Sequence, residues 1–273
     1  MGVTHCGKST FCWGERTYVM GIINVSPDSF SGDGLNSVDA AVAQAQRFVA
    51  EGVDILDVGG ESTRPNSTPI SVDEELRRVI PVLERLAGKT GVPLSVDTYK
   101  LDVARRALDA GAEMLNDIWG LNKEPRLAVL AAEKGVPIIL MSNQRDEPQR
   151  HIVSAVIADL KMSIDMALDA GVPWENIIVD PGVGFGKTLE QNLELVRRLD
   201  ELKALGRPIL LGISRKSMIG LVLDLPPEQR LEGTAASTAI GIARGADIIR
   251  VHDVREMMRV CRMSDAIVRG RRN

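Results

Sequence analysis

The chain has little of what would mark a disulfide-bonded, membrane-spanning or nucleic-acid-binding protein. Its three cysteines, Cys6, Cys12 and Cys261, are an odd number in a chain too long to need covalent staples, so reduced thiols and a cytoplasmic location are expected. No apolar run approaches the roughly 20 residues that cross a bilayer, and the N-terminus MGVTHCGKST lacks the apolar core of a signal peptide. The formal net charge of -4 argues against a nucleic-acid platform, which would carry a basic face. We therefore expect neither a nucleic-acid partner nor a membrane association.

What the chain does have is a repeated alternation of short apolar runs with longer amphipathic stretches. Eight runs are nearly continuous in Val, Ile and Leu, as in parallel strands covered on both faces, and they span 18–25, 53–60, 92–98, 113–118, 136–141, 176–182, 207–214 and 247–253. The amphipathic stretches between them include 38–50, 72–86, 101–110, 154–170, 189–205 and 230–244. Glycine ends most of these stretches just before the next strand.

Eight strand–helix units in 273 residues predict an α/β fold of the (β/α)8 TIM-barrel type, and a doubly wound open sheet is the alternative. Residues 1–17 are expected to form a short hairpin that plugs the bottom of the barrel, where Trp13 would find a place to pack. Residues 18–273 are expected to form a single domain, because no linker, low-complexity tract or charge block interrupts them.

Polar residues recur where the predicted strands end. The run MGIINV, for example, stops at Asn24 and continues into the loop SPDSFSGDG. The residues at or near such ends are Asn24, Asp57, Asp97, Asn116, Asp180, Ser214, Arg250 and His252. A barrel places the carboxyl ends of its strands on one face, where the loops build the active site. These scattered residues are therefore predicted to meet in one pocket.

The first chemical subset of this group consists of hydrogen-bond acceptors. Asp97, Asn116 and Asp180 suit the edge of a flat heterocycle that carries amino and ring N–H groups. Buried carboxylates need such donors, because an unpaired charge in a deep pocket is unfavourable. Lys216 and Arg250 bring positive charge to the same end of the barrel, and the planar guanidinium of Arg250 can also stack on a ring.

The second subset combines cations with a hydroxyl and an amide, as a diphosphate requires. Its members are Asn24, Thr63, Arg64, Arg250 and His252. A diphosphate accepts many hydrogen bonds and is generally accompanied by Mg²⁺, which the amide oxygen of Asn24 could ligate. No group of His and Cys residues has the spacing of a zinc site.

Eight motifs in order make the chain resemble the dihydropteroate synthase family, the sulfonamide-inhibited enzymes of folate biosynthesis. The motifs are NVSPDSFSGDG, DVGGESTRP, SVDTYK, LNDIWG, VDPGVGFGKT, GISRKSMIG, EGTAAS and RVHD. They extend from about residue 18 to residue 254, which is nearly the whole chain. The resemblance implies a transferase that joins 7,8-dihydropterin-6-ylmethyl diphosphate to 4-aminobenzoate and releases diphosphate, with Mg²⁺ as cofactor. It also implies a homodimer.

The resemblance assigns roles to individual positions. The pterin would be held by Asp97, Asn116, Asp180 and Lys216, with Arg250 packed on its ring. The diphosphate would be held by Asn24, Thr63, Arg64, Arg250 and His252, with Asn24 as the Mg²⁺ ligand. The 4-aminobenzoate would lie among Phe30, Thr63, Pro65, Phe185, Ser214 and Lys216. The residues implied in catalysis itself are Asn24, Asp97, Lys216, Arg250 and His252. Apart from the resemblance, the loops after the first two strands are both rich in Ser, Pro and Gly and could close to exclude water, the first as a lid that carries Asp28, Ser29 and Phe30.

Two other functions share parts of this pattern. A methyltetrahydrofolate–corrinoid methyltransferase would need the pterin acceptors but no grip on diphosphate, so SRKS and RVHD argue against it. A pterin-binding paralogue without activity is the second alternative. The intact set of Asn24, Lys216, Arg250 and His252 argues against it. The segment LMSNQRD keeps it open, because many members of the resembled family carry a Met-His-Met-like segment there. That departure puts the shape of the pocket in doubt more than the activity.

Three motifs also have simpler structural interpretations. PGVGFGKT at 181–188 is not a Walker A loop, because Pro181 stands where the first glycine is required, and Thr188 with Gln191 predicts a capping box instead. Asp97 could equally cap the helix that follows it. Asp253, with Glu256 three residues later, predicts a second capping box.

Overall fold

Eight parallel strands form a closed barrel in the computed structural model, which describes residues 2–25, 37–62, 68–145 and 150–270. The strands are β3 (Tyr18–Asn24), β4 (Ile55–Gly59), β5 (Leu94–Asp97), β6 (Met114–Asp117), β7 (Ile138–Met141), β8 (Ile177–Asp180), β9 (Leu210–Gly212) and β10 (Ile248–Val251). The sheet order is β8-β7-β6-β5-β4-β3-β10-β9, and a parallel bridge between Val179 and Ile209 joins the two edge strands. The TIM-barrel prediction is confirmed, and the open-sheet alternative is wrong.

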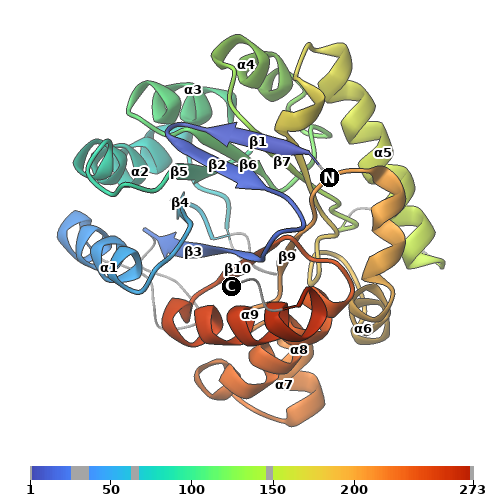
Figure 1. The fold of residues 1–273 in the computed structure, drawn as a ribbon. Coiled ribbons are helices and arrows are strands. Elements are labelled where there is room, and N and C mark those ends of the chain that lie inside the picture. The colour runs from blue at the N-terminus through green and yellow to red at the C-terminus, as the bar shows by residue number, and fades with distance from the viewer. Residues whose placement is uncertain (1, 26–36, 63–67, 146–149, 271–273) are drawn as a thin grey trace.

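Helices surround the strands, as Figure 1 shows in a view along the barrel. They are α1 (Val38–Ala50), α2 (Val72–Leu86), α3 (Leu101–Asp109), α4 (Arg126–Lys134), α5 (Ile152–Asp169), α6 (Leu189–Arg197), α7 (Ser217–Leu223), α8 (Leu231–Ala243) and α9 (Val254–Val268). Three short 3-10 helices are η1 (Trp174–Asn176), η2 (Leu199–Leu205) and η3 (Pro227–Gln229). The main apolar core lies between the strands and this layer of helices. None of the described helices is both long and apolar enough to cross a membrane.

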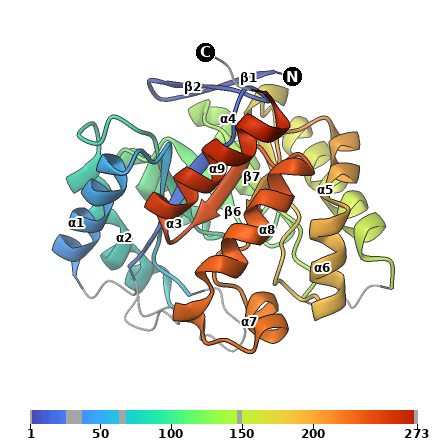
Figure 2. The same cartoon turned by 60° about the horizontal axis from the view of Figure 1, so that its bottom comes forward.

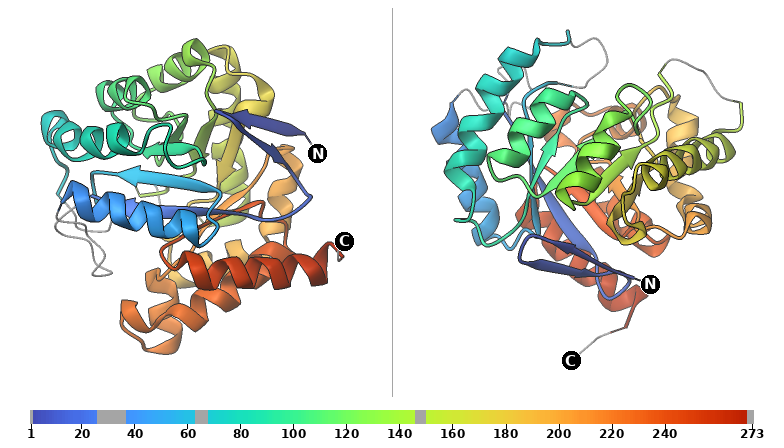
Figure 3. Two further views of the ribbon diagram at one scale, coloured as in Figure 1. Left: turned by 60° about the vertical axis from the view of Figure 1, so that its left-hand side comes forward. Right: turned by 90° about the horizontal axis from the view of Figure 1, so that it is seen from above.

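The antiparallel hairpin of β1 (Val3–Cys6) and β2 (Ser9–Cys12) lies across one end of the barrel (Figures 2 and 3). Phe11 and Trp13 stack with ring centroids 5.5 Å apart, and Tyr18 meets both rings edge-on. The rings form one buried cluster with the inward side chains Met20, Ile55, Met114, Ile139, Ile178, Leu210 and Ile248. The amino-terminal end of the barrel is therefore filled by apolar side chains.

The predicted helix 189–205 is divided in two, which corrects the expectation from the sequence. The α-helix ends at Arg197, and the chain continues as the 3-10 helix η2. Leu199, Leu202 and Leu205 are all buried. Their spacing of three residues matches the three-residue turn of a 3-10 helix, so this geometry places all three on the core side.

The ends of the helices follow local chemistry. The capping box predicted from Thr188 and Gln191 is confirmed by both of its hydrogen bonds. Gly135 and Gly206 end α4 and η2 with φ of 66°, in the left-handed region where a side chain would be strained. These turns direct the chain into β7 and β9.

Candidate active site

The predicted polar residues meet at the carboxyl end of the barrel, opposite the hairpin. Gly212, the last residue of β9, marks the place where three of them converge. A Cβ atom built on Gly212 would lie 3.7 Å from Nζ of Lys216, 3.9 Å from Oδ2 of Asp180 and 4.0 Å from Cβ of Arg250. Because these residues come from separate segments of the chain, the barrel is what assembles them.

The guanidinium of Arg250 bridges two carboxylates at the centre of the site. Its Nε donates to Oδ2 of Asp57 at 2.6 Å, and its Nη2 donates to Oδ2 of Asp97 at 2.7 Å. Asp57 is completely buried, and the Arg250 side chain is 20% exposed. The pKa of Arg250 is raised by the two carboxylates against the effect of burial. Sequence reasoning placed Asp57 at a strand end but gave it no role.

Asp57 also orients Asn116, because Nδ2 of Asn116 donates to Oδ2 of Asp57 at 3.0 Å. The second oxygens of Asp57 and Asp97 are buried and have no hydrogen-bond partner within the described part of the protein. Burial raises the pKa of Asp97 to about 7, with Arg250 opposing the shift and Asp57 adding to it. Such acceptors favour a ligand that supplies N–H donors. The alternative that Asp97 caps α3 is wrong, since the cap position is Lys100 and no side chain caps the helix.

Asp180 and Lys216 form the second charged pair of the site. Burial raises the pKa of Asp180, while Lys216 and the Gly182 N–H, which donates at 2.7 Å, act in the opposite direction. Burial lowers the pKa of Lys216 to about 8, and Asp180 opposes that shift. Lys216 also donates to the carbonyl oxygen of Val183, and its Nζ lies 4.7 Å from the centroid of the Phe185 ring. Three carboxyl groups thus share the site with two cations.

His252 and Ser214 are brought together at the end of the neighbouring strands. Nδ1 of His252 lies 3.0 Å from Oγ of Ser214, and the backbone N–H of His252 donates to the same oxygen at 3.2 Å. The predicted capping box at Asp253 is wrong. Its carboxylate instead accepts from Nε of Arg215 at 2.9 Å and from Nη2 at 2.5 Å, and no side chain caps α9. This ion pair ties the SRKS loop to the RVHD loop.

Four of the predicted site residues, Phe30, Thr63, Arg64 and Pro65, lie outside the described residues. Asn24, the last residue of β3, is half-buried, and its side chain makes no hydrogen bond to other residues of the described ranges. Its amide oxygen is therefore available to a ligand. The described residues contain no group of three or more His, Cys, Asp or Glu that could hold a metal ion.

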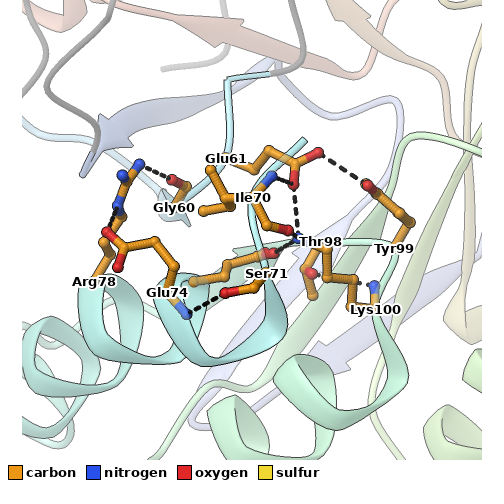
Figure 4. Close-up of polar contacts among 10 residues, drawn as sticks. Gly60, Glu61, Ile70, Ser71, Glu74, Arg78, Thr98, Tyr99 and Lys100 are labelled. Atoms are coloured by element: carbon orange, nitrogen blue, oxygen red, sulfur yellow. Dashed lines mark hydrogen bonds and ion pairs between the residues drawn. The ribbon is translucent and has the colours of Figure 1, made fainter. Parts of the chain in front are cut away.

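A buried ionic cluster fastens both ends of the segment that carries Thr63 and Arg64 (Figure 4). Nζ of Lys100 donates to Oε2 of Glu61 and to Oε2 of Glu75, both at 2.6 Å, and to the carbonyl oxygen of Ile70 at 2.8 Å. The backbone N–H of Ile70 donates to Glu61 at 3.0 Å, and the Tyr99 hydroxyl donates to Glu61 at 3.0 Å. The residues on both sides of 63–67 are thus joined through one ammonium group.

An apolar wall that sequence reasoning missed stands beside the acids. Ile118, Trp119 and Met141 form a buried cluster with Phe185 packed against it. Met141 is paired in register with Asp180 on the adjacent strand. A flat ring could lie along such a wall with its polar edge on the carboxylates. The sequence offered little signal for it, because apolar residues at strand ends resemble those of the core.

Ser142 and Gln144 of the departing segment LMSNQRD are held by a polar network with Asp159. Oγ of Ser142 donates to Asp159 at 2.6 Å, and Nε2 of Gln144 donates to Oγ of Ser142 at 3.0 Å and to Asp159 at 3.2 Å. Ser142 is fully buried. The Ser142 hydroxyl and the Gln144 amide nitrogen therefore have their hydrogen-bond partners within the protein.

The motif PGVGFGKT does not form a phosphate-binding loop. Nζ of Lys187 donates to the backbone carbonyl oxygens of Ser142, Gly182 and Phe185 at 3.0, 2.9 and 3.0 Å. The interpretation against a Walker A loop is consistent with this geometry, since the ammonium is occupied by carbonyl groups.

Comparison with known proteins identifies relatives over nearly the whole chain. The family model described as "Pterin binding enzyme" matches residues 20–252. The dihydropteroate synthase of Clostridium beijerinckii is 51% identical over 96% of this chain and 98% of its own length. The dihydropteroate synthase of Bacillus subtilis is 48% identical over 97% of this chain and 94% of its own length.

Solved structures give the same result. A dihydropteroate synthase from Clostridium difficile, crystallised in the presence of pteroic acid, superposes with a TM-score of 0.90 at 52% identity, covering 95% of this chain and 99% of that one. The Yersinia pestis enzyme in a complex with a sulfonamide drug has a TM-score of 0.92 at 39% identity, covering 97% and 99%. By sequence and by structure, the chain belongs to the pterin-binding enzymes and, among them, to the dihydropteroate synthases, which are transferases.

Proposed function

We propose that this site binds 7,8-dihydropterin-6-ylmethyl diphosphate and 4-aminobenzoate and joins them to 7,8-dihydropteroate, in the folate pathway. The observation that carries the proposal is the convergence of Asp97, Asn116 and Asp180 with Lys216 and Arg250 in one pocket. The buried oxygen of Asp97 that has no hydrogen-bond partner among the described residues suits the amino and ring N–H groups of a pterin. Arg250 would lie against the ring.

The diphosphate would extend from the pterin toward the rim of the barrel. Asn24 and His252 lie at the carboxyl ends of the paired strands β3 and β10. Thr63 and Arg64 would provide further contacts to the diphosphate. The amide oxygen of Asn24 fits a hard cation, which prefers oxygen ligands. When bound, Mg²⁺ would neutralise part of the charge that develops on the departing diphosphate.

The reaction we propose begins with cleavage of the bond between the pterin methylene carbon and the diphosphate oxygen, which keeps the electron pair. The methylene cation is delocalised into the pterin ring, where the carboxylates of Asp97 and Asp180 stabilise it. The amine nitrogen of 4-aminobenzoate then forms the new C–N bond and loses a proton. The amine would approach from a subsite made by Phe30, Thr63, Pro65, Phe185, Ser214 and Lys216. No protein nucleophile is needed in this SN1-like sequence.

The deciding experiment is a coupled assay of diphosphate release with pterin diphosphate, 4-aminobenzoate and Mg²⁺. The proposal expects release that depends on the amine. Pterin binding without release would support the non-catalytic paralogue, and methyl transfer from methyltetrahydrofolate to a corrinoid would support the methyltransferase. The cations Lys216 and Arg250 near the acids favour the synthase over both.

Removal of Mg²⁺ is expected to weaken binding of pterin diphosphate but not binding of a bare pterin. With EDTA present, affinity for pterin diphosphate should fall by about tenfold or more, because the diphosphate charge is then met by protein groups alone. Affinity for a bare pterin should change little, since Asp97, Asn116 and Asp180 need no metal. Titration calorimetry with both ligands tests this. A similar loss for both ligands, or for neither, would contradict the metal assignment.

We infer a homodimer from the outer face of three neighbouring helices (Figure 2). Large apolar side chains are exposed on α7, α8 and α9, namely Leu221, Val222, Leu223, Ile240 and Ile267. Exposed apolar side chains on neighbouring helices are candidates for an interaction surface, and a second copy presents the same ones. Ile240→Asp together with Ile267→Asp is expected to convert a dimer to a monomer in light scattering while circular dichroism stays unchanged. A wild-type monomer would refute the inference.

The free thiols of Cys6, Cys12 and Cys261 support a cytoplasmic location.

A further inference from the structure

The loop 181–187 between β8 and α6 is packed tightly on the loop that follows β7. A Cβ atom built on Gly182 would lie 1.9 Å from the carbonyl oxygen of Ser142, and one on Gly186 would lie 2.3 Å from the backbone nitrogen of Arg145. Both glycines also have left-handed φ, 66° and 68°. No other residue could bring the two backbones this close without a shift.

Lys187 provides the polar contacts between these two loops. Its ammonium reaches one carbonyl of the β7 loop, that of Ser142, and two carbonyls of its own loop, those of Gly182 and Phe185. An ammonium has three N–H groups, so these three acceptors use all of them. From the other side, Asn192 of α6 accepts from the N–H of Gly184 at 2.6 Å and donates to the carbonyl of Lys187 at 3.1 Å.

The same loop carries two groups that touch Lys216. The carbonyl of Val183 accepts from its ammonium, and the Phe185 ring lies 4.7 Å from it. The Arg145 guanidinium also lies 4.7 Å from the Phe185 centroid. The ring is therefore in contact with a cation from each of two loops.

We propose that Lys187 is a positioning residue of the active site, which locks the β8–α6 loop to the β7–α5 loop and so fixes Phe185 and the Val183 carbonyl against Lys216. Lys187 need not touch either substrate. The inference rests on the proposed function in one respect, namely that Phe185 and Lys216 border the 4-aminobenzoate subsite. It explains why a lysine follows the glycines of PGVGFGKT in a protein where that segment binds no phosphate.

The proposal has a consequence for pH. Burial lowers the pKa of Lys187 to about 7. Asp180 opposes this shift, and Lys216 adds to it. Of two smaller effects, Asp159 raises the pKa and Arg145 lowers it. Below that pH the ammonium serves all three carbonyls. Above it the neutral amine keeps two N–H groups, and one carbonyl loses its donor. The loop is therefore held most firmly when Lys187 is protonated.

The test measures KM for 4-aminobenzoate and kcat at saturating pterin diphosphate from about pH 6 to 8.5 in three variants. Lys187→Met is expected to raise KM by about tenfold and to change kcat by less than about threefold. Lys187→Arg, which stays charged, should keep a low KM and remove the rise in KM that the wild type shows as pH increases through about 7. Lys89→Met is the matched control, because Lys89 is exposed at the end of α2 and donates to a single carbonyl, that of Arg85.

Each result decides the proposal. If Lys187→Met lowers the melting temperature and leaves KM unchanged, Lys187 is merely structural. If Lys187→Met does not fold, Lys187→Arg still decides, because a pH profile identical to that of the wild type would overturn the proposal. Lys216 titrates near pH 8 in all variants, so the comparison uses the rise in KM through about pH 7, which only the wild type should show. A wild-type protein without diphosphate release would instead refute the proposed function.

Discussion

Arg250→Ala is expected to abolish turnover and to lower the free energy of unfolding at pH 8 by about 3 to 5 kcal/mol, as when one partner of a buried ion pair is removed. The substitution leaves the carboxylates of Asp57 and Asp97 facing each other without the guanidinium that bridges them. Binding of a bare pterin should weaken as well, because Asp57 also holds Asn116. Diphosphate-dependent binding should weaken much more, since the cation is lost.

The destabilisation should depend on pH in a definite direction. The pKa of Asp97 is raised by burial to about 7, so the folded protein binds more protons than the unfolded chain between about pH 4 and 7, and stability falls as pH rises through that window. Arg250 opposes this shift, so its removal raises the pKa of Asp97 further. The deficit of Arg250→Ala in urea unfolding should therefore be smaller at pH 5 than at pH 8.

A matched control for Arg250→Ala is available on the surface. Arg244 forms an exposed ion pair with Asp200 at 3.5 Å. Arg244→Ala should change the free energy of unfolding by no more than about 1 kcal/mol at either pH. A deficit for Arg250→Ala that is equally small would mean that the bridge between the carboxylates is not important to the fold. A deficit that grows on acidification would contradict the pKa argument for Asp97.

Asp180→Asn is expected to reduce pterin affinity by about 100-fold or more, whether or not diphosphate is attached, because on the proposed assignment the carboxylate that accepts from the ring N–H groups becomes a weaker, neutral acceptor. A second effect adds to the first. Asp180 is the carboxylate that raises the pKa of Lys216 against its burial, so Lys216 should lose its proton at a lower pH in the variant. Titration calorimetry with the pterin and with its diphosphate checks both ligands.

The exposed Asp169 at the end of α5 provides the control for charge alone, and Asp169→Asn should bind both ligands as the wild type does. The expected pattern differs from that of Arg250→Ala, whose loss is greater for the diphosphate. If Asp180→Asn lost affinity only for the diphosphate ester, Asp180 would not be the residue that recognises the ring.

Most of the barrel could be predicted from the sequence because each buried strand is marked by its own residues. Apolar runs bounded by glycine locate the strands, and a strand end such as Asp180 or Asn116 can be recognised without knowing its neighbours. The partner of each side chain could not be predicted. Asp57 looked like any other acid at a strand end, and only the closed barrel places it beside Arg250.

Predictions from short sequence patterns failed where a residue distant in the sequence bound the same side chain. Asp253 and Glu256 have the spacing of a capping box, but Arg215 lies within reach of Asp253, and a bidentate ion pair is stronger than a cap. At 199–205 the apolar spacing of three residues overrode the expectation of a continuous α-helix. The first difference comes from a tertiary contact that no short window contains, whereas the second is written in the local spacing of the leucines.

Among the described residues, the hairpin and the apolar side chains beside it close the amino-terminal end of the barrel, with Phe11, Trp13 and Tyr18 in one buried cluster. Substrates are therefore expected to arrive and depart through the opposite end. On the proposed assignment the pterin occupies the innermost place, so we expect it to enter before 4-aminobenzoate and the product to leave with its aminobenzoate end first.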